Sequence, residues 1–441
     1  MNKLIFEGYK ATYPLIEFFY SYNGNHYCNG LRLDNFNLIN EERIGRVDMN
    51  ILNRIYSYIG IALSIKLFAV NYFDEIEVKS IALTGAELDF FSRTLTAGFG
   101  EYRYINHIPA DHQIKVISIS AENFLVKARP LSLHDHALVC NGGGKDSVVA
   151  AEICRELQLP LTWLIYNPKP DQMELVNLFG KEPAVTFHNM PDANIEKQKA
   201  YNGHKPLSLL LACLSLLPAS VLQCRYIVVA NEYSANFANL TVDGIEINHQ
   251  FTKSWEFEKS FSNLVHNHIS PDLDYFSILR PLYEIKIAQL FSKMPRYFDN
   301  FISCNKARSL HKWCGVCAKC AFIYLILSAF LSKEQMHHIF GKDLFQTGII
   351  KTHIKDLLTD GAKPFECVGT RDECLLAYYL CTEKYPQLEI LPLEDHQKIM
   401  DELAMIDIKK LKSEVLEELH EPHGIPKILW DKVKNAYQSL A

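Results

Sequence analysis

The 441-residue chain lacks several features that would assign it to a common class of protein. Its 45 Lys and Arg are outnumbered by 51 Asp and Glu, for a net charge of -6, whereas nucleic-acid binders usually show a basic face. Residues 1–7 include an acid and no apolar segment with a small-residue cleavage site, so no signal peptide is expected. The apolar runs 207–217 and 321–331 have about half of the roughly 20 residues that a membrane-spanning helix needs. These absences predict a cytoplasmic globular protein without a nucleic-acid or membrane partner.

Twelve cysteines in a chain without an expected export signal are expected to be thiols or metal ligands rather than disulfides. Cys304, Cys314, Cys317 and Cys320 have the spacing C-x9-C-x2-C-x2-C, and Gly315 supplies a bend between neighbouring ligands. Four thiolates at these separations suit tetrahedral Zn²⁺ and leave no open position for water, so the predicted site is structural. An iron–sulfur cluster and reduced cysteines sharing a loop are the alternatives.

Short apolar strands alternate with helices of about ten residues in the middle of the chain. The expected strands are 137–141, 161–166, 184–188 and 225–230, and the expected helices are 147–157, 171–179 and 206–217. This alternation predicts a parallel sheet with right-handed crossovers and helices on both faces. Ligands bind at the carboxyl ends of such strands, where the loops 141–147, 167–171 and 231–239 fall.

The segments on either side differ from this pattern. Residues 1–130 are rich in aromatics, with alternating stretches at 15–22 and 115–120 that predict strands and an apolar helix near 51–72. The tail 394–441 is charged and has helical spacing. We therefore predict an α/β fold with three domains. These are an α+β N-terminal domain (1–130), a nucleotide-binding α/β domain with the cysteine loop (131–330) and a mainly helical C-terminal region (331–441).

A glycine-rich turn, residues 141–147, joins the first of these strands to its helix. Such a turn presents backbone amides at a helix N-terminus, which is a site for phosphate. A Walker A loop is excluded because Val139 and Asp146 stand where it needs Gly and Ser or Thr, and the dinucleotide fingerprint is only partly met. The turn resembles the Ser-Gly-Gly-X-Asp-Ser loop of the PP-loop ATP pyrophosphatases, with Gly142 in place of the first Ser. A glycine-rich β-turn before a capped helix is the structural alternative.

The residues of this turn suit ATP and Mg²⁺. The glycines let the backbone wrap around phosphates, Ser147 and the first helix amides bind diphosphate, and Asp146 is a ligand for Mg²⁺. The residues that we assign to the nucleotide are Gly142, Gly143, Gly144, Lys145, Asp146 and Ser147.

Two dense polar stretches lie downstream, at 230–258 and 363–370. A polar run directly after a buried strand is typical of a ligand loop, and an ordinary surface loop is the alternative for the first stretch. Together with Gly203-His204, the segment 313–322 and the glycine-rich turn, these stretches resemble, in their order, the UDP-N-acetylmuramoyl-L-alanyl-L-glutamate epimerase family, MurL. The resemblance spans roughly residues 137–370.

This resemblance implies an enzyme of peptidoglycan precursor synthesis that is dependent on ATP and Mg²⁺. It would convert the terminal L-Glu of UDP-MurNAc-L-Ala-L-Glu to D-Glu through an acyl-adenylate, releasing AMP and diphosphate. Adenylation removes the charge of the carboxylate and so acidifies the neighbouring Cα proton, which a positioned base and acid can then move.

Several residues in these motifs have suitable chemistry. The candidates for proton transfer are Cys367, Glu366, His249 and Glu232, and the candidates for neutralising phosphates are Lys145, Lys205 and Lys253. Glu232 could equally contact ribose or magnesium, His249 could be a loop histidine, and Cys367 could be a small buried apolar residue.

Other functions stay open at this point. The glycine-rich turn and the cysteines also resemble 7-cyano-7-deazaguanine synthase, although that enzyme is shorter and its loop begins with Ser. Another PP-loop adenylating enzyme, such as a tRNA-modifying ligase, and a nucleotide-binding protein without chemistry are further alternatives. Release of AMP and diphosphate separates the enzymes from the last class, and exchange of a Cα proton separates the epimerase from other adenylating enzymes.

Overall fold

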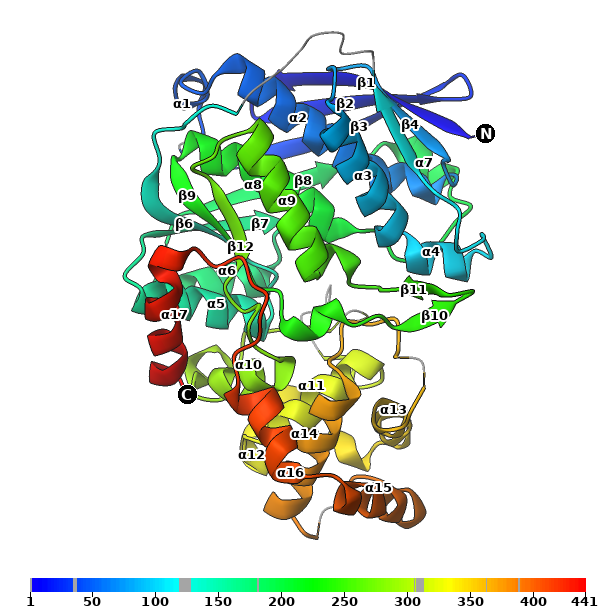
Figure 1. The fold of residues 1–441 in the computed structure, drawn as a ribbon, viewed down its shortest axis with the longest axis vertical. Coiled ribbons are helices and arrows are strands. Elements are labelled where there is room, and N and C mark those ends of the chain that lie inside the picture. The colour runs from blue at the N-terminus through cyan, green and yellow to red at the C-terminus, as the bar shows by residue number, and fades with distance from the viewer. Residues whose placement is uncertain are drawn as a thin grey trace.

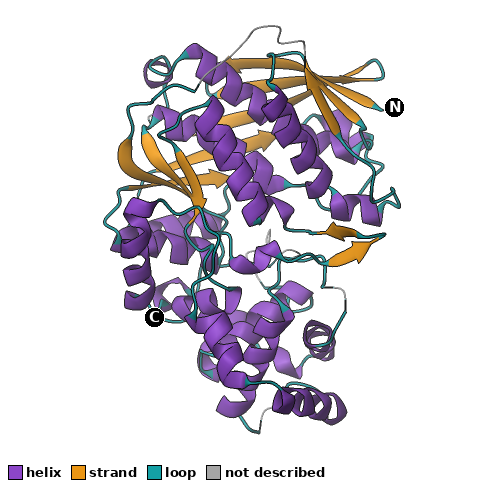
Figure 2. Ribbon diagram, in the orientation of Figure 1, coloured by secondary structure: helices purple, strands orange, loops and turns teal. Residues whose placement is uncertain are grey.

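The computed structural model describes residues 2–34, 38–118, 128–180, 182–304, 306, 313–361, 363–387 and 389–441. A ten-stranded sheet with flanking helices forms one end of the molecule, and a helical region forms the other (Figure 1, Figure 2). The strand order is β12-β9-β6-β7-β8-β3-β2-β1-β4-β5. The strands are β1 (Lys3–Thr12), β2 (Leu15–Tyr22), β3 (Asn25–Asp34), β4 (Glu75–Val78), β5 (Lys115–Ser118), β6 (His134–Cys140), β7 (Leu161–Tyr166), β8 (Ala184–Met190), β9 (Cys224–Val229) and β12 (Asp274–Ser277).

The sheet is mostly parallel. The neighbours from β12 to β8 run parallel, as do β1, β4 and β5. The pairs β1–β2, β2–β3 and β3–β8 are antiparallel. Because β3 pairs with β8, the N-terminal strands continue the sheet that the strands after residue 130 begin. The division of the chain into three domains stays a prediction.

Helices pack on both faces of the sheet, as predicted. Ala137 and Val139 of β6 face one hydrophobic core with α5, α6 and α10, whereas Leu138 faces a second core with α2, α3, α8 and α9. This alternation is the period of two of a strand buried on both sides. The helices of this part are α1 (Glu41–Ile44), α2 (Met49–Leu63), α3 (Gly85–Gly98), α4 (Gly100–Ile105), α5 (Lys145–Glu156), α6 (Pro170–Phe179), α7 (Ala193–Lys197), α8 (Leu207–Val221), α9 (Trp255–His268) and α10 (Glu284–Phe291).

The C-terminal region is helical, as predicted. Its helices are α11 (Ala318–Ser328), α12 (Lys333–Phe340), α13 (Gly348–Leu358), α14 (Arg371–Lys384), α15 (Leu393–Met405), α16 (Ile408–Lys412) and α17 (Lys427–Ser439). The last of these, red in Figure 1, returns to the sheet and packs beside α5. The hydroxyl of Tyr437 on α17 donates a hydrogen bond to the carbonyl of Ile278, just after β12.

The strands and helices expected between residues 137 and 230 are all present, with small shifts at their ends. The expected strand 15–22 is β2, and the expected strand 115–120 is β5 as far as Ser118, while 119–120 lie outside the described residues. The sequence did not predict β12, because its four residues Asp-Tyr-Phe-Ser show no alternation.

The apolar helix expected near 51–72 is α2 followed by the 3₁₀-helix η1 (Ser64–Ala69). The stretch Met49–Ala69 is long and apolar enough to cross a membrane, but 89% of its most apolar window is buried inside the protein. Gly60 of α2 lies so close to β1 that a Cβ at this position would come within 2.1 Å of Cζ of Phe6. The apolar character of this stretch is therefore accounted for by its packing in the core.

Candidate active site

A cavity of about 240 Å³ lies at the carboxyl ends of β6 and β9 and is enclosed by segments that are far apart in the sequence. Two of the three loops expected at this edge of the sheet line it, the glycine-rich turn and the start of 231–239. The cavity is lined by Gly142 and Gly144 of the turn and by the polar side chains of Asp146, Ser147, Ser208, Asn231, Lys253, Ser303, Lys319 and Cys367.

The glycine-rich turn is held by its own polar groups. The amide of Gly142 donates to Oγ of Ser147 (2.8 Å), and the amide of Gly143 donates to Oδ1 of Asn141 (2.8 Å). Gly143 has φ +81°, which favours glycine. Gly144 is the N-cap of α5, and no side chain among the described residues caps this end of the helix. The first amides of α5 are therefore suited to an anion, which the helix dipole also favours.

A buried ionic network lies under this turn. Lys145 is fully buried and forms ion pairs with Asp146 and Glu284, and Nζ of Lys319 lies 3.3 Å from Oε1 of the same Glu284. Burial and the charge of Glu284 raise the pKa of Asp146 to about 6, although Lys145 opposes them. Burial would raise the pKa of Glu284, but Lys145 and Lys319 outweigh it and lower this pKa to about 2.

These contacts separate the roles of the two charged residues of the turn. Asp146 lines the cavity with its side chain 24% exposed, and a divalent cation there would favour its ionised form. Lys145 is not among the residues that line the cavity, because its ammonium is held by two carboxylates beneath the turn.

Cys367 lines the same cavity and lies next to two basic side chains. Nζ of Lys253 is 3.5 Å from its Sγ, and His249 forms a hydrogen bond with the same thiol. Burial would raise the pKa of Cys367, but Lys253, His249 and Lys319 outweigh it and lower this pKa to about 6.

His249 is in turn paired with Glu101 of α4 through its Nδ1 atom. Burial would lower the pKa of His249, but Cys367 and Glu101 raise it to about 9. At a pH between about 6 and about 9, Cys367 is therefore a thiolate and His249 is an imidazolium. The structure thus brings together two of the four residues predicted for proton transfer, Cys367 and His249.

The residues that line the cavity do not include His249, Gly143, Glu366, Glu232 or Lys205. Glu366 accepts a hydrogen bond from the amide of Lys319 (2.7 Å) in the first turn of α11, and so helps to hold Lys319. Glu232 is buried, and its charge contributes to the raised pKa of Asp146. Lys205 is half-buried and is not among the residues that line the cavity.

The four clustered cysteines converge beside the cavity. One ligand atom from each of Cys304, Cys314, Cys317 and Cys320 lies within 4.8 Å of all the others. Sγ of Cys314 is 3.6 Å from Sγ of Cys320, close to the separation of about 3.8 Å that follows from tetrahedral Zn–S bonds of about 2.3 Å. The donor set therefore fits the predicted zinc site, and Cys320 directly follows the cavity residue Lys319.

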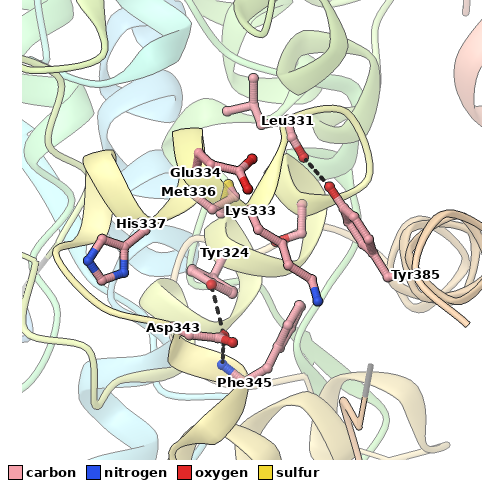
Figure 3. Close-up of a pocket in the computed structure, with 10 residues that line it drawn as sticks. Tyr324, Leu331, Lys333, Glu334, Met336, His337, Asp343, Phe345 and Tyr385 are labelled. Carbon is pink, nitrogen blue, oxygen red and sulfur yellow. Dashed lines mark hydrogen bonds between the residues drawn. The ribbon is translucent and has the colours of Figure 1, made fainter. Parts of the chain in front are cut away.

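A separate cavity of about 400 Å³ lies in the helical region, between α11, α12 and the end of α14 (Figure 3). Tyr324 donates a hydrogen bond to Asp343, and Tyr385 donates one to the carbonyl of Leu331. None of the residues predicted for catalysis, nucleotide or metal lines this cavity.

The sequence did not single out three residues of the site. Lys319 stands between Cys317 and Cys320, so its place in the cysteine motif was the available signal. Glu101 lies in the aromatic N-terminal part, where no motif marks it, and Glu284 follows the unpredicted strand β12.

Family models match most of the chain. The model described as the MurL N-terminal domain matches residues 8–278, and that described as the MurL C-terminal domain matches residues 300–406. The chain belongs to the MurL family. The matches confirm the predicted family and extend it beyond residues 137–370, to the N-terminal strands and the helical region.

Three MurL relatives carry the name UDP-N-acetyl-alpha-D-muramoyl-L-alanyl-L-glutamate epimerase. That of Xanthomonas oryzae pv. oryzae is 31% identical over 385 residues, which cover 83% of each chain. That of a Micromonospora species is 33% identical over 300 residues, 66% of each chain. That of Salinispora tropica is 33% identical over 302 residues, 66% of this chain and 65% of the relative. An epimerase is an isomerase, so these relatives confirm the predicted enzyme class.

Proposed function

We propose that this chain catalyses the ATP-dependent epimerisation of the terminal L-Glu of UDP-MurNAc-L-Ala-L-Glu to D-Glu in peptidoglycan precursor synthesis. The names of its relatives support the substrate. The observation that carries the mechanism is one cavity lined both by the glycine-rich turn and by Cys367 with Lys253, whose Nζ is 3.5 Å from Sγ. A phosphate site and a thiolate at one cavity suit activation of a carboxylate followed by removal of the adjacent proton.

The glycine-rich turn is assigned to the nucleotide. The uncapped amides at the start of α5 would bind its phosphates, and Asp146 would be a ligand for Mg²⁺. ATP supplies the adenylyl group that neutralises the substrate carboxylate. The side chain of Lys319, which lines the cavity, adds positive charge close to this turn.

Cys367 is assigned to removal of the Cα proton. In the proposed step the proton moves from Cα to Sγ, and the electron pair of the C–H bond moves onto the adenylated acyl group. The ammonium of Lys253, 3.5 Å from Sγ, is placed to stabilise the negative charge that develops. Water then gives a proton to the opposite face of Cα, Sγ releases its proton to solvent, and hydrolysis of the adenylate gives D-Glu and AMP.

His249 and Glu101 maintain the thiolate in this proposal. The imidazolium forms a hydrogen bond with Cys367, and the carboxylate of Glu101 keeps the imidazole protonated. The cysteine cluster would hold a structural Zn²⁺ that fixes the neighbouring Lys319. The cytoplasmic location stays a prediction from the sequence.

Two half-reactions test this proposal separately. Wild-type protein with ATP, Mg²⁺ and UDP-MurNAc-L-Ala-L-Glu should release AMP and diphosphate, and in D₂O it should exchange the Cα hydrogen. Cys367→Ala should lose the exchange but keep substrate-dependent exchange of diphosphate into ATP, whereas Asp146→Ala should lose both. Unchanged Cα exchange in Cys367→Ala would remove Cys367 from the mechanism, and absence of AMP in the wild type would refute the proposed activation.

A further inference from the structure

A larger cavity, of about 610 Å³, shares the segment 363–370 with the candidate active site. Cys367 lines the active-site cavity, whereas Lys363, Pro364, Gly369 and Thr370 line the larger one. The larger cavity also has aromatic residues, Tyr233, Phe237 and Tyr283, and acidic residues, Asp356, Asp360, Asp372 and Glu414. A ligand that occupies it would therefore lie next to the chain segment that carries the thiolate.

Lys363 differs from the other lysines near the thiolate. Lys145 and Lys319 form ion pairs with Glu284, and Lys253 lies against Cys367. The Nζ atom of Lys363 is buried and has no hydrogen-bond partner among the described residues. A buried ammonium without a partner destabilises the folded protein, so a lysine in such a position is expected to have a role in binding.

The backbone around Lys363 is firmly held. Its amide donates to the carbonyl of Asn239 (2.9 Å), and Nδ2 of Asn239 donates to the carbonyl of Pro364 (2.7 Å). The buried position of the lysine is therefore built into the fold by a second loop of the active site.

The carboxylate of Glu373 is already engaged by other groups. It accepts hydrogen bonds from the amide of Thr370 (2.6 Å), the hydroxyl of Ser234 (2.7 Å) and the amide of Ile285 (3.1 Å). Burial lowers the pKa of Lys363, and the charges of Glu373, Glu232 and Cys367 oppose this shift without removing it. An anionic ligand would restore the ammonium form.

We propose that Lys363 binds the carboxylate of the substrate's terminal glutamate that is not adenylated. This inference rests on the proposed function, because a glutamyl substrate brings two carboxylates and activation neutralises only the one beside Cα. The second carboxylate must leave water with its charge, which requires a cation at the site. Lys363 is the lysine at these two cavities that the described residues leave without a partner.

The substrate's diphosphate is the competing source of an anion. Four carboxylates line the larger cavity, and Arg371, which also lines it, is already paired with Asp360 and Glu402. This lining disfavours a group with two negative charges. It suits an uncharged sugar, whose hydroxyls donate hydrogen bonds to carboxylates and whose apolar faces pack on aromatic rings. The surroundings of Lys363 thus favour a single carboxylate, with the sugar farther out in the cavity.

Binding measured by calorimetry without ATP tests this assignment. The ligands are UDP-MurNAc-L-Ala-L-Glu, the same compound ending in L-Gln, and UDP. Wild-type protein should bind the Glu compound about 10- to 100-fold more tightly than the Gln compound, the range expected for a hydrogen bond between charged groups. Lys363→Met should bind both compounds equally, and Lys363→Arg should keep the preference for Glu.

Lys384→Met is the matched control. Burial also lowers the pKa of Lys384, but this lysine is exposed and lies at the far end of α14, where it donates to the carbonyl of Leu331 (2.7 Å). This variant should keep the preference for Glu.

Three results would overturn the assignment. The first is a preference for Glu that persists in Lys363→Met. The second is a loss of UDP affinity in Lys363→Met, which would place the diphosphate at Lys363. In both of these cases AMP release by the wild type would leave the proposed epimerase function standing. In the third, the wild type would neither bind the Glu compound nor release AMP, and the proposed function would fail together with the assignment.

Discussion

Replacement of Lys253 by methionine is expected to raise the pKa of the Cys367 thiol and to move its alkylation to higher pH. The surroundings lower this pKa from 9.0 to about 6, and Lys253 is the first of the groups responsible, with Nζ 3.5 Å from Sγ. An opposite charge at this range shifts a pKa by about 1–3 units, so the variant should titrate near pH 7–9. At pH 6 the ionised fraction would fall from about one half to about one tenth or less, and the alkylation rate would fall at least about five-fold.

The assay is alkylation by iodoacetamide between pH 4 and 10, with Cys367 followed by mass spectrometry of its peptide. Burial raises the pKa of Cys140 to about 12, so this neighbouring thiol should not react in the lower half of the range. Lys205→Met, a half-buried lysine that does not line the cavity, is the control and should match the wild type. An unchanged profile in Lys253→Met would refute the electrostatic origin of the low pKa.

The pKa values of Cys367 and His249 set the pH range of activity. As the pH falls through about 6, Cys367 gains a proton and the thiolate is lost. As the pH rises through about 9, His249 loses its proton and the imidazolium is lost. The proposed epimerase should therefore show a bell-shaped dependence of kcat/KM between these values, and a profile that is flat across pH 6 would contradict the role of Cys367.

Further predictions concern the nucleotide, the metal and the core. Asp146→Ala and Ser147→Ala should each lose ATP binding measured by calorimetry, and full retention by both would exclude the phosphate site. Cys320→Ser should lose about one equivalent of zinc by elemental analysis and unfold at a lower temperature; metal-free wild-type protein that is fully folded would contradict the zinc site. Gly60→Ala should lower the free energy of unfolding by about 1–3 kcal/mol, measured with denaturant, because its Cβ would overlap the ring of Phe6. A stability equal to that of the wild type would show that the ring moves aside without cost.

The central sheet could be predicted because its strands are short apolar runs between turn residues and ten-residue helices. The pairing of β3 with β8 could not be predicted, because antiparallel pairing between strands so far apart in the sequence leaves no local pattern. The apolar stretch 49–69 was predicted as a helix, but the sequence does not show that it packs against β1 through Gly60.

The candidate site was predictable where a motif fixes the spacing of residues along the chain. The glycine-rich turn and the four cysteines belong to this class: the turn joins β6 to α5, and the four thiols lie within 4.8 Å of one another. The pairing of Glu101 with His249 joins residues far apart in the sequence, so only the fold reveals it. Glu366 and Glu232 were chosen for their chemistry and motif, and their positions outside the lining of the cavity depend on side-chain directions that spacing does not determine.

The most direct test is the configuration of the product. Purified protein would be incubated with ATP, Mg²⁺ and UDP-MurNAc-L-Ala-L-Glu, and the glutamate recovered by acid hydrolysis would be resolved by chiral chromatography. The proposed function predicts D-Glu accompanied by AMP, and neither product without ATP. Recovery of L-Glu alone, with no AMP, would contradict it.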